Sequence, residues 1–137
     1  MKLTSGQTAA REMTVTLEMV KAYAEITGDY NPLHFDEAFA GRTRFKRLIA
    51  QGGITTGLLH ALVAMDMPGP GTVFISQSWS FPRPVYIGDT IRAEARVRSV
   101  DPQRPRADIE FTVTNQRGEE VLTGEATVFQ AEPSGGS

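Results

Sequence analysis

One long apolar stretch decides the fold. Residues 48–65 read Leu-Ile-Ala-Gln-Gly-Gly-Ile-Thr-Thr-Gly-Leu-Leu-His-Ala-Leu-Val-Ala-Met. From Gly53 onward the stretch is apolar on nearly every side of a helix, too long for a typical strand and too short to cross a bilayer. A helix without a polar face belongs inside a core. We therefore predict a central helix that the rest of the chain covers.

Three glycines, Gly52, Gly53 and Gly57, lie in or next to this predicted helix. Inside a helix each one costs about 1 kcal/mol relative to alanine. We infer that another backbone or a ligand comes close to the helix N-terminus, where free N–H groups can bind an oxyanion. His60 lies among apolar residues of the same helix. We interpret it as a core or interface histidine, with catalysis as the weaker alternative.

The second half of the chain alternates apolar and polar residues, as strands with one buried face do. The first such strand alternates Val73, Ile75, Gln77, Trp79 and Phe81 with Phe74, Ser76, Ser78 and Ser80. The pattern recurs over residues 91–98 and 107–114, and residues 115–118 predict a hairpin turn before a last strand at 120–130. Because the connections are short, we expect antiparallel neighbours whose polar side chains face solvent.

The first quarter of the chain is mostly helical by its pattern. A lead-in strand over 7–13 precedes a helix that ends at Gly28, and Asp36 caps a second, short helix. The whole chain thus predicts an α+β fold in which an antiparallel sheet curls around the central helix, with exposed edges that favour a dimer. We expect one domain over residues 1–130 and a flexible tail over 131–137.

Composition narrows the classes of function. Hydrophobic residues make up 40% of the 137 and charged residues 22%, which is ordinary for a soluble globular protein. The absence of cysteine excludes thiol catalysis, disulfides and thiolate metal sites. A net charge of −2 argues against nucleic-acid binding. With neither a secretory signal nor a membrane span in the pattern, we expect a cytoplasmic protein that does not enter membranes.

One segment has the residue types of an acid/base site. Residues 27–36 read Thr-Gly-Asp-Tyr-Asn-Pro-Leu-His-Phe-Asp. They include Asp29 and His34, the latter one of only two histidines. On a helix of about 100° per residue, these two would lie far apart around the axis. Pro32 favours irregular backbone, which would let the acid and the imidazole converge as a general acid/base pair. The alternative is that Asp29 caps a turn and His34 fills a polar gap.

Residues 41–47, Gly-Arg-Thr-Arg-Phe-Lys-Arg, form a basic run. We interpret this run as a solvated, mobile loop, because most charge runs are solvated surface. The alternative is a patch that docks the phosphates of a ligand.

Several ordered motifs resemble the MaoC-like (R)-specific enoyl-CoA hydratases, also called hydratase 2. The motifs lie at residues 28–36, 49–52, 77–81 with 84–85, 88–89 and 123–126. An ordered set of motifs is far more specific than any one of them. The resemblance implies a hot-dog fold, a homodimer and a hydro-lyase. The implied reaction is syn addition of water to a trans-2-enoyl-CoA to give the (R)-3-hydroxyacyl-CoA, with dehydration as the reverse.

The resemblance also implies roles for single residues. Asp29 would be the base that takes a proton from water, while His34 would help to activate the water and deliver a proton to the α-carbon. The backbone N–H of Gly52 would polarise the thioester carbonyl. The residues expected to bind substrate or shape its site are Asn31, Gly53 and Arg83, with the cations of residues 42–47 as further candidates for contact with coenzyme A. Coenzyme A is part of the substrate, so we expect no cofactor and no metal.

Two positions depart from the family pattern. Gln51 stands where many relatives have His, and Gly57 stands where some have Ser. Neither change touches the acid and the imidazole, so both bear on substrate range more than on activity. Two other functions remain open: an acyl-CoA thioesterase, which shares the hot-dog architecture, and a non-catalytic acyl-CoA-binding module.

Overall fold

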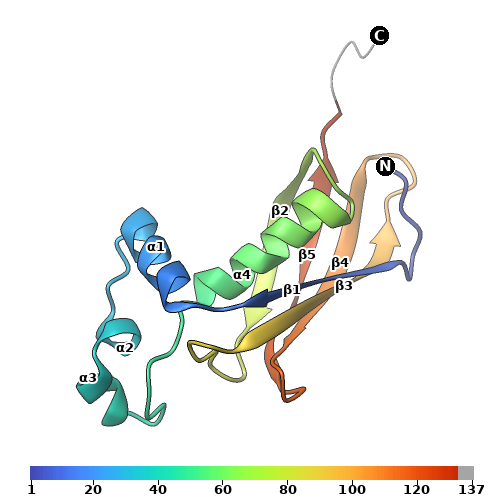
Figure 1. The fold of residues 1–137 in the computed structure, drawn as a ribbon. Coiled ribbons are helices and arrows are strands. Elements are labelled where there is room, and N and C mark those ends of the chain that lie inside the picture. The colour runs from blue at the N-terminus through green and yellow to red at the C-terminus, as the bar shows by residue number, and fades with distance from the viewer. Residues whose placement is uncertain (133–137) are drawn as a thin grey trace.

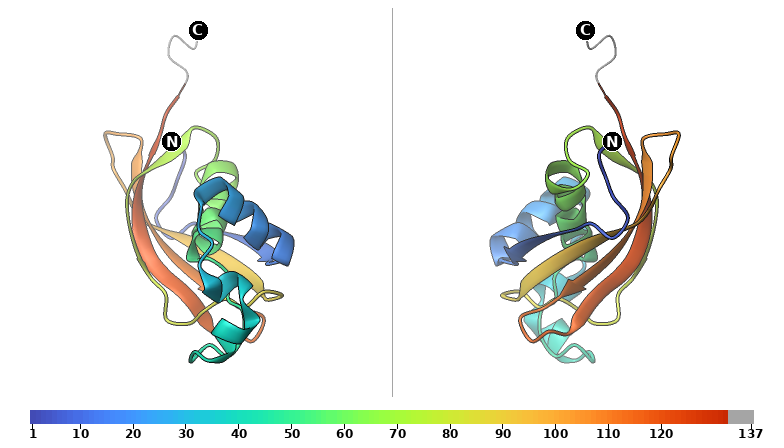
Figure 2. Two further views of the ribbon diagram at one scale, coloured as in Figure 1. Left: turned by 90° about the vertical axis from the view of Figure 1, so that its left-hand side faces the viewer. Right: turned by 90° about the vertical axis from the view of Figure 1, so that its right-hand side faces the viewer.

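Helix α4, Gly52–Ala61, lies in the hollow of a five-stranded antiparallel sheet (Figure 1). The computed structural model describes residues 1–132. Side views show the sheet curving around α4, with the helices that precede it on the same side of the sheet (Figure 2). This arrangement confirms the predicted α+β hot-dog fold. The part of the predicted tail from residue 133 onward lies outside the described residues.

Short helices precede α4, and each has a clear local cause. Their bounds are α1, Leu17–Thr27; α2, Pro32–Phe35; and α3, Glu37–Gly41. Thr16 caps α1 by accepting a hydrogen bond from the Met19 N–H at 3.3 Å. Gly28 ends that helix with a φ of 82°, a left-handed conformation that suits glycine. Asp36 caps α3 as predicted, accepting from the Phe39 N–H at 3.0 Å.

The strands follow the order β1-β3-β4-β5-β2 across the sheet. Their bounds are β1, Thr8–Thr14; β2, Thr72–Ser80; β3, Thr90–Val100; β4, Arg106–Thr114; and β5, Glu120–Gln130. The last three are antiparallel neighbours, as expected. The same expectation is wrong for β2, which pairs with β5 instead of β3. The place beside β3 is taken by β1, so the chain crosses to the other edge of the sheet.

The apolar alternation over residues 73–81 breaks inside β2. Its pairing with β5 shifts after Phe74 and leaves Ile75 as an extra residue, a β-bulge. Phe74 therefore faces inward, with its ring centroid 6.3 Å from that of Phe111. Val73 and Ile75 are 54% and 49% exposed. The predicted inner face is wrong at the start of this strand, because one extra residue exchanges the two faces.

The core lies between α4 and the inner face of the sheet. From α4 it takes Ile54, Leu58 and Leu59, and the chain continues past Ala61 into a π-helical turn, η1, Leu62–Asp66, which buries Leu62 and Val63. From the sheet it takes the apolar half of each alternating strand, including Ile91, Ala93, Ala95, Val97, Ile109, Phe111 and Val113. Within residues 1–132, no helix is long and apolar enough to cross a membrane.

Candidate active site

Asp29 and His34 come together after the end of α1. Asp29 lies in the loop before α2 and His34 lies on α2, with 3.8 Å between His34 Nε2 and Asp29 Oδ1. The sequence predicts irregular backbone throughout, whereas Pro32 begins a one-turn helix. Proline suits this first position because its missing N–H would have no partner there. The irregular part is only the loop between Gly28 and Asn31, and it suffices to bring the acid and the imidazole together.

Asn31 shapes this loop. Its Oδ1 accepts a hydrogen bond from the Leu33 N–H at 3.0 Å, which caps α2. Its own N–H donates to Asp29 Oδ1 at 3.3 Å. The same residue therefore starts the helix that carries the histidine and orients the carboxylate. A contact between Asn31 and substrate remains a prediction.

The His34 ring is fixed from behind. Its side chain is 7% exposed, and Nδ1 lies 2.7 Å from the carbonyl oxygen of Ile49. A carbonyl oxygen can only accept, so Nδ1 carries the hydrogen and Nε2 is the atom presented to Asp29. The Asp29 side chain is 41% exposed. The pair thus has one buried, rigid member and one member that solvent can reach.

Thr27 holds Asp29 from the helix side. Its hydroxyl donates to the Tyr23 carbonyl at 2.7 Å and accepts from the Asp29 N–H at 3.2 Å. This hydroxyl therefore connects the last turn of α1 to the backbone of the acid. Thr27 is not among the site residues predicted from the sequence. The signal that could have found it is a threonine in the last helical turn before a functional loop, since Thr side chains often bond to nearby backbone.

The N-terminus of α4 keeps free backbone donors. Gln51 occupies the N-cap position but makes no side-chain cap; its Nε2 instead donates to the Val20 carbonyl of α1 at 3.0 Å. The first N–H groups of a helix have no partner within the helix, so the N–H of Gly52 is available to a ligand. A Cβ at Gly52 would lie 3.2 Å from the ring of Phe81. Gln51 thus fastens α1 to α4 without covering this donor.

Gly53 and Gly57 differ in what surrounds them. A Cβ at Gly53 would lie 1.7 Å from the hydroxyl oxygen of Tyr23, so no larger residue fits there unless α1 or its tyrosine moves. A Cβ at Gly57 would have no heavy atom within 4 Å. At Gly53 the close neighbour is therefore a side chain of α1 and not the second backbone that the sequence suggests, while the approach of a ligand remains a prediction. At Gly57 the described residues leave open space.

A pocket of about 220 Å³ opens beside the start of α4. Its lining includes Gly52, Ile49, Phe81 and the predicted substrate-binding residue Arg83. Ile49 connects the pocket to the predicted acid/base pair, because its carbonyl accepts a hydrogen bond from the His34 ring. Asp29 and His34 lie behind this wall and do not themselves line the pocket. The structure thus brings the predicted carbonyl-binding residue and the predicted acid/base pair to one end of α4.

The model of the MaoC-like domain family matches residues 3–121. The chain belongs to this family. A 3-hydroxybutyryl-CoA dehydratase of Methylorubrum extorquens is 42% identical over 123 residues, which cover 90% of this chain and 78% of that protein. An (R)-specific enoyl-CoA hydratase of Aeromonas caviae is 37% identical over 123 residues, covering 90% of this chain and 92% of that protein.

Solved structures agree with the family assignment. The structure of an (R)-hydratase from A. caviae involved in PHA biosynthesis superposes with a TM-score of 0.89 at 36% identity. The match covers 94% of this chain and 98% of the other. Both chains therefore share the MaoC-like architecture over nearly their whole length.

In this MaoC-like domain the basic run has a defined turn. The Thr43 hydroxyl donates to the Ala40 carbonyl and accepts from the Phe45 N–H. The guanidinium groups of three arginines lie over aromatic rings: Arg42 over Phe39, Arg44 over Phe45 and Arg47 over Tyr86. Of the cations in the run, Arg44 lines the pocket beside Gly52. The loop is thus more organised than the solvated-loop interpretation implies.

His60 is not a core residue. It is exposed, and its ring centroid lies 4.3 Å from that of Phe74. The core interpretation is wrong because this side of α4, near its C-terminal end, is not covered by other described elements. The interface interpretation remains a prediction.

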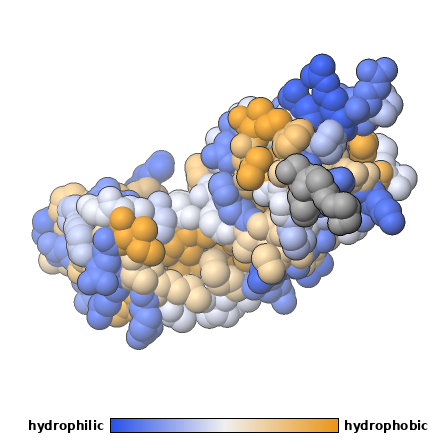
Figure 3. Space-filling model, turned by 90° about the horizontal axis from the view of Figure 1, so that it is seen from above, coloured by the Kyte–Doolittle hydropathy of each residue, from blue (hydrophilic) through white to orange (hydrophobic). Residues whose placement is uncertain are grey.

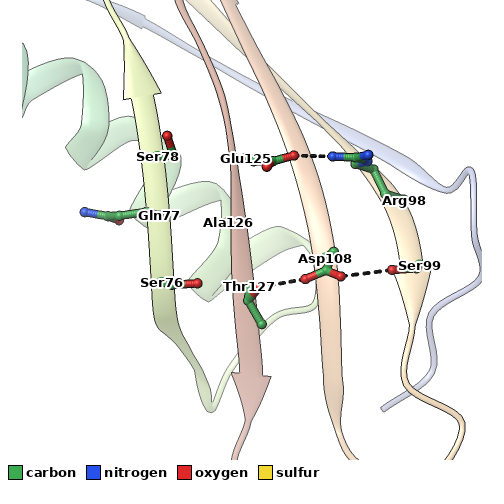
Figure 4. A pocket seen from close by; sticks show the side chains of 9 residues that line it. All are labelled: Ser76, Gln77, Ser78, Arg98, Ser99, Asp108, Glu125, Ala126 and Thr127. Carbon is green, nitrogen blue, oxygen red and sulfur yellow. Dashed lines mark hydrogen bonds and ion pairs between the residues drawn. The ribbon is translucent and has the colours of Figure 1, made fainter.

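The MaoC-like domain has a second hollow, of about 470 Å³, on the outer face of its sheet (Figure 4). Arg98 pairs with Glu125 across its floor. Asp108 accepts from the Ser99 hydroxyl at 3.1 Å and from the Thr127 hydroxyl at 2.6 Å. These polar groups satisfy one another. Among the described residues, no three His, Asp or Glu side chains gather into a group that could hold a metal.

Proposed function

We propose that this MaoC-like domain is an (R)-specific enoyl-CoA hydratase. It adds water to a trans-2-enoyl-CoA to give the (R)-3-hydroxyacyl-CoA, and it catalyses the reverse dehydration. The dehydratase of M. extorquens and the hydratase of A. caviae support this reaction class by their names. The observation that carries the proposal is the 3.8 Å separation of His34 Nε2 and Asp29 Oδ1 beside the free N-terminus of α4.

The separation suits a bridging water. At 3.8 Å the two atoms are too far apart for a direct hydrogen bond. A water placed about 2.8 Å from each can accept from an Nε2–H and donate to the carboxylate. Asp29 Oδ1 already receives the Asn31 N–H, which holds the carboxylate, and a carboxylate oxygen can accept a second hydrogen bond from the water. The water is then oriented from both sides.

Proton transfers in the proposed reaction balance. Asp29 takes a proton from the water, and the water oxygen forms a bond to C3 of the enoyl group. The C2–C3 double bond becomes single, and C2 receives a proton from His34. The proton on Asp29 then returns to His34 and resets the pair. General acid–base catalysis of this kind contributes about 10²- to 10⁴-fold to the rate.

Gly52 serves the carbonyl end of the substrate in this proposal. Negative charge develops on the thioester oxygen as the C2–C3 bond is attacked, and the free N–H groups at the start of α4 stabilise it. Gly53 leaves room for the Tyr23 side chain of α1 to pack beside this helix start, and Arg83 contacts the substrate. Coenzyme A arrives with the substrate, so this scheme uses no separate cofactor or metal.

We further propose a cytoplasmic homodimer that pairs through β2. This strand lies at the edge of the sheet, so one side of its backbone has no partner strand among the described residues. Val73 and Ile75 add exposed apolar side chains there. Seen from above, hydrophobic surface gathers in several places between polar side chains (Figure 3). An unprotected, apolar edge favours pairing with a second copy.

Crotonyl-CoA tests the function directly. We expect loss of the enoyl absorbance without release of free thiol, and a product of the R configuration on chiral analysis. Thiol release without hydration would instead indicate a thioesterase. Tight binding of every enoyl-CoA tried, from four carbons upward, with no turnover would indicate a non-catalytic module.

A further inference from the structure

Two arginines from distant parts of the chain meet at the pocket beside Gly52. Arg44 comes from the basic run after α3, and Arg83 comes from the connection between β2 and β3. Both line the same pocket of about 220 Å³, together with the rings of Phe45 and Phe81. No aspartate or glutamate among the described residues lines it. The pocket therefore combines positive charge with apolar walls, which strengthen the field of a charge.

The Arg44 guanidinium is available to a ligand. The side chain is exposed, and its Cζ lies 5.0 Å from the centroid of the Phe45 ring. It forms no ion pair with any carboxylate of residues 1–132. The ring holds the guanidinium in place by stacking, which does not use its N–H donors.

Arg83 has only weak protein partners. Its Nε lies 3.9 Å from a Glu119 oxygen, and one terminal nitrogen donates to the Glu120 carbonyl at 3.2 Å. Glu119 is engaged more closely elsewhere, accepting from Arg117 at 2.8 Å and from Asn115 at 2.9 Å. Most donors of the Arg83 fork therefore remain free for an anion.

We propose that Arg44 and Arg83 form an anion-binding site that recognises a negatively charged group of the thioester substrate. The proposal rests on the hydratase function and deepens it. Guanidinium groups bind phosphate and carboxylate by the same forked hydrogen bonds. The anion is therefore a phosphate of the coenzyme A nucleotide or a carboxylate at the far end of the acyl group. The two sources are separable by experiment.

The kinetic test compares Arg44→Ala and Arg83→Ala with Arg92→Ala as the matched control. Arg92 is an exposed arginine on β3 whose nearest carboxylate oxygen, on Glu94, is 4.0 Å away, and it does not line the pocket. The substrates are crotonyl-CoA, crotonyl-pantetheine, which lacks the nucleotide, and glutaconyl-CoA, which adds a terminal carboxylate. We expect each pocket variant to lose about tenfold in kcat/KM on the substrate that carries the recognised anion, a typical loss for a charge-assisted hydrogen bond.

The pattern of losses identifies the source of the anion. A loss on both coenzyme A thioesters that is absent on crotonyl-pantetheine assigns the site to a phosphate. A loss confined to glutaconyl-CoA assigns it to the acyl carboxylate. Equal losses on all three substrates, or no difference from Arg92→Ala on any of them, would overturn the proposal.

A binding measurement separates this proposal from the hydratase function. Titration calorimetry with coenzyme A and with glutaryl-CoA measures binding at the site in the absence of turnover. Weaker binding of either ligand to Arg44→Ala and Arg83→Ala, with Arg92→Ala unchanged, supports the anion site even if the wild type hydrates nothing. Unchanged binding of both ligands in all three variants overturns the site and leaves the hydratase proposal to the crotonyl-CoA assay.

Discussion

Acidic and basic side chains meet in two quite different regions of this molecule. On the outer face of the sheet, Arg98 and Glu125 pair in the open, with 52% and 58% of their side chains exposed. At the end of α1, Asp29 faces a histidine that is 7% exposed, across a gap too wide for a direct hydrogen bond. The outer groups satisfy one another, while the inner pair leaves room for a third molecule. Unsatisfied polar groups beside a rigid, buried partner mark the better candidate site.

Size alone would choose the wrong region. The outer hollow has about twice the volume of the pocket beside Gly52, about 470 Å³ against about 220 Å³. Its floor is a set of surface ion pairs and hydroxyl–carboxylate bonds (Figure 4). Exposed pairs of this kind contribute about 0 to 1 kcal/mol to stability. The smaller pocket adjoins free helix N–H groups and the carbonyl that fixes His34.

The largest expected effect is on kcat, which should fall for changes in the inner pair and stay nearly constant for a change on the outer face. Asp29→Asn and His34→Ala should each lower kcat on crotonyl-CoA by about a thousandfold, within the range of general acid–base catalysis. Asp108→Asn, the same change on the outer face, should alter kcat less than about twofold because it lies in a surface network. Initial rates of enoyl absorbance loss measure all three, and circular dichroism checks their folding. Near-normal turnover in either inner variant would remove that residue from the mechanism.

The next largest effect is on the free energy of unfolding, which we expect to change in opposite directions at two glycines of α4. Gly53→Ala forces a Cβ to within 1.7 Å of the Tyr23 hydroxyl oxygen, and overpacking typically costs about 1–3 kcal/mol. Gly57→Ala meets nothing within 4 Å and should raise the free energy of unfolding by about 0.5–1 kcal/mol through helix propensity. Urea unfolding of the two variants measures both. Two changes of the same sign would show that α1 does not pack on Gly53 as described.

Thr27 sharpens the comparison within the inner region. Thr27→Val removes the hydroxyl that connects the Tyr23 carbonyl to the Asp29 N–H, and we expect kcat to fall about fivefold, near the value of one hydrogen bond. Thr27→Ser keeps the hydroxyl and should restore kcat. The split between kcat and KM is the measurement, since a looser Asp29 lowers kcat with little change in KM. A normal kcat in Thr27→Val would show that Thr27 does not position Asp29 for the reaction.

The smallest expected effect is on the pH dependence of stability and concerns the exposed ion pair of Glu119 with Arg117. Hydrogen bonds from Asn115 and then from Arg117 hold the pKa of Glu119 below its usual value. The folded state therefore binds fewer protons than the unfolded state. The stabilisation is complete above the unfolded pKa, about 4.3, and is lost as the pH falls through the folded one. Glu119→Gln should flatten the acid side of the Tm-against-pH curve, and an unchanged slope would contradict this.

Much of the fold follows from sequence because its signals are local. The apolar run around α4, the Asp36 cap and the alternation along β3 each depend on residues close in the chain. The pairing of β2 with β5 depends on which edge of the sheet is already occupied. The exposure of His60 depends on which side of α4 the sheet leaves uncovered. No local pattern carries that information.

The candidate site also has some residues that the sequence suggests and others that only the three-dimensional packing reveals. Asp29, His34 and Gly52 are suggested by residue type and motif, and the structure places them around one end of α4. Thr27 and the Tyr23 contact on Gly53 arise from how α1 packs against α4, a three-dimensional fact that residue spacing does not reveal. The meeting of Arg44 and Arg83 likewise requires the β2–β3 connection to reach the basic run.

The bulge in β2 also determines how this strand tolerates changes in length. Because Ile75 is the extra residue, deleting it would leave the hydrogen bonds on both sides able to close into a regular ladder. The same deletion would keep Phe74 opposite Val128 and facing Phe111, so the inner aromatic packing would survive together with the strand. An insertion or deletion elsewhere in β2 would turn Trp79 outward instead. Length variation in relatives should therefore concentrate at this one position, and an alignment that ignores it would assign residues 72–74 to the wrong face.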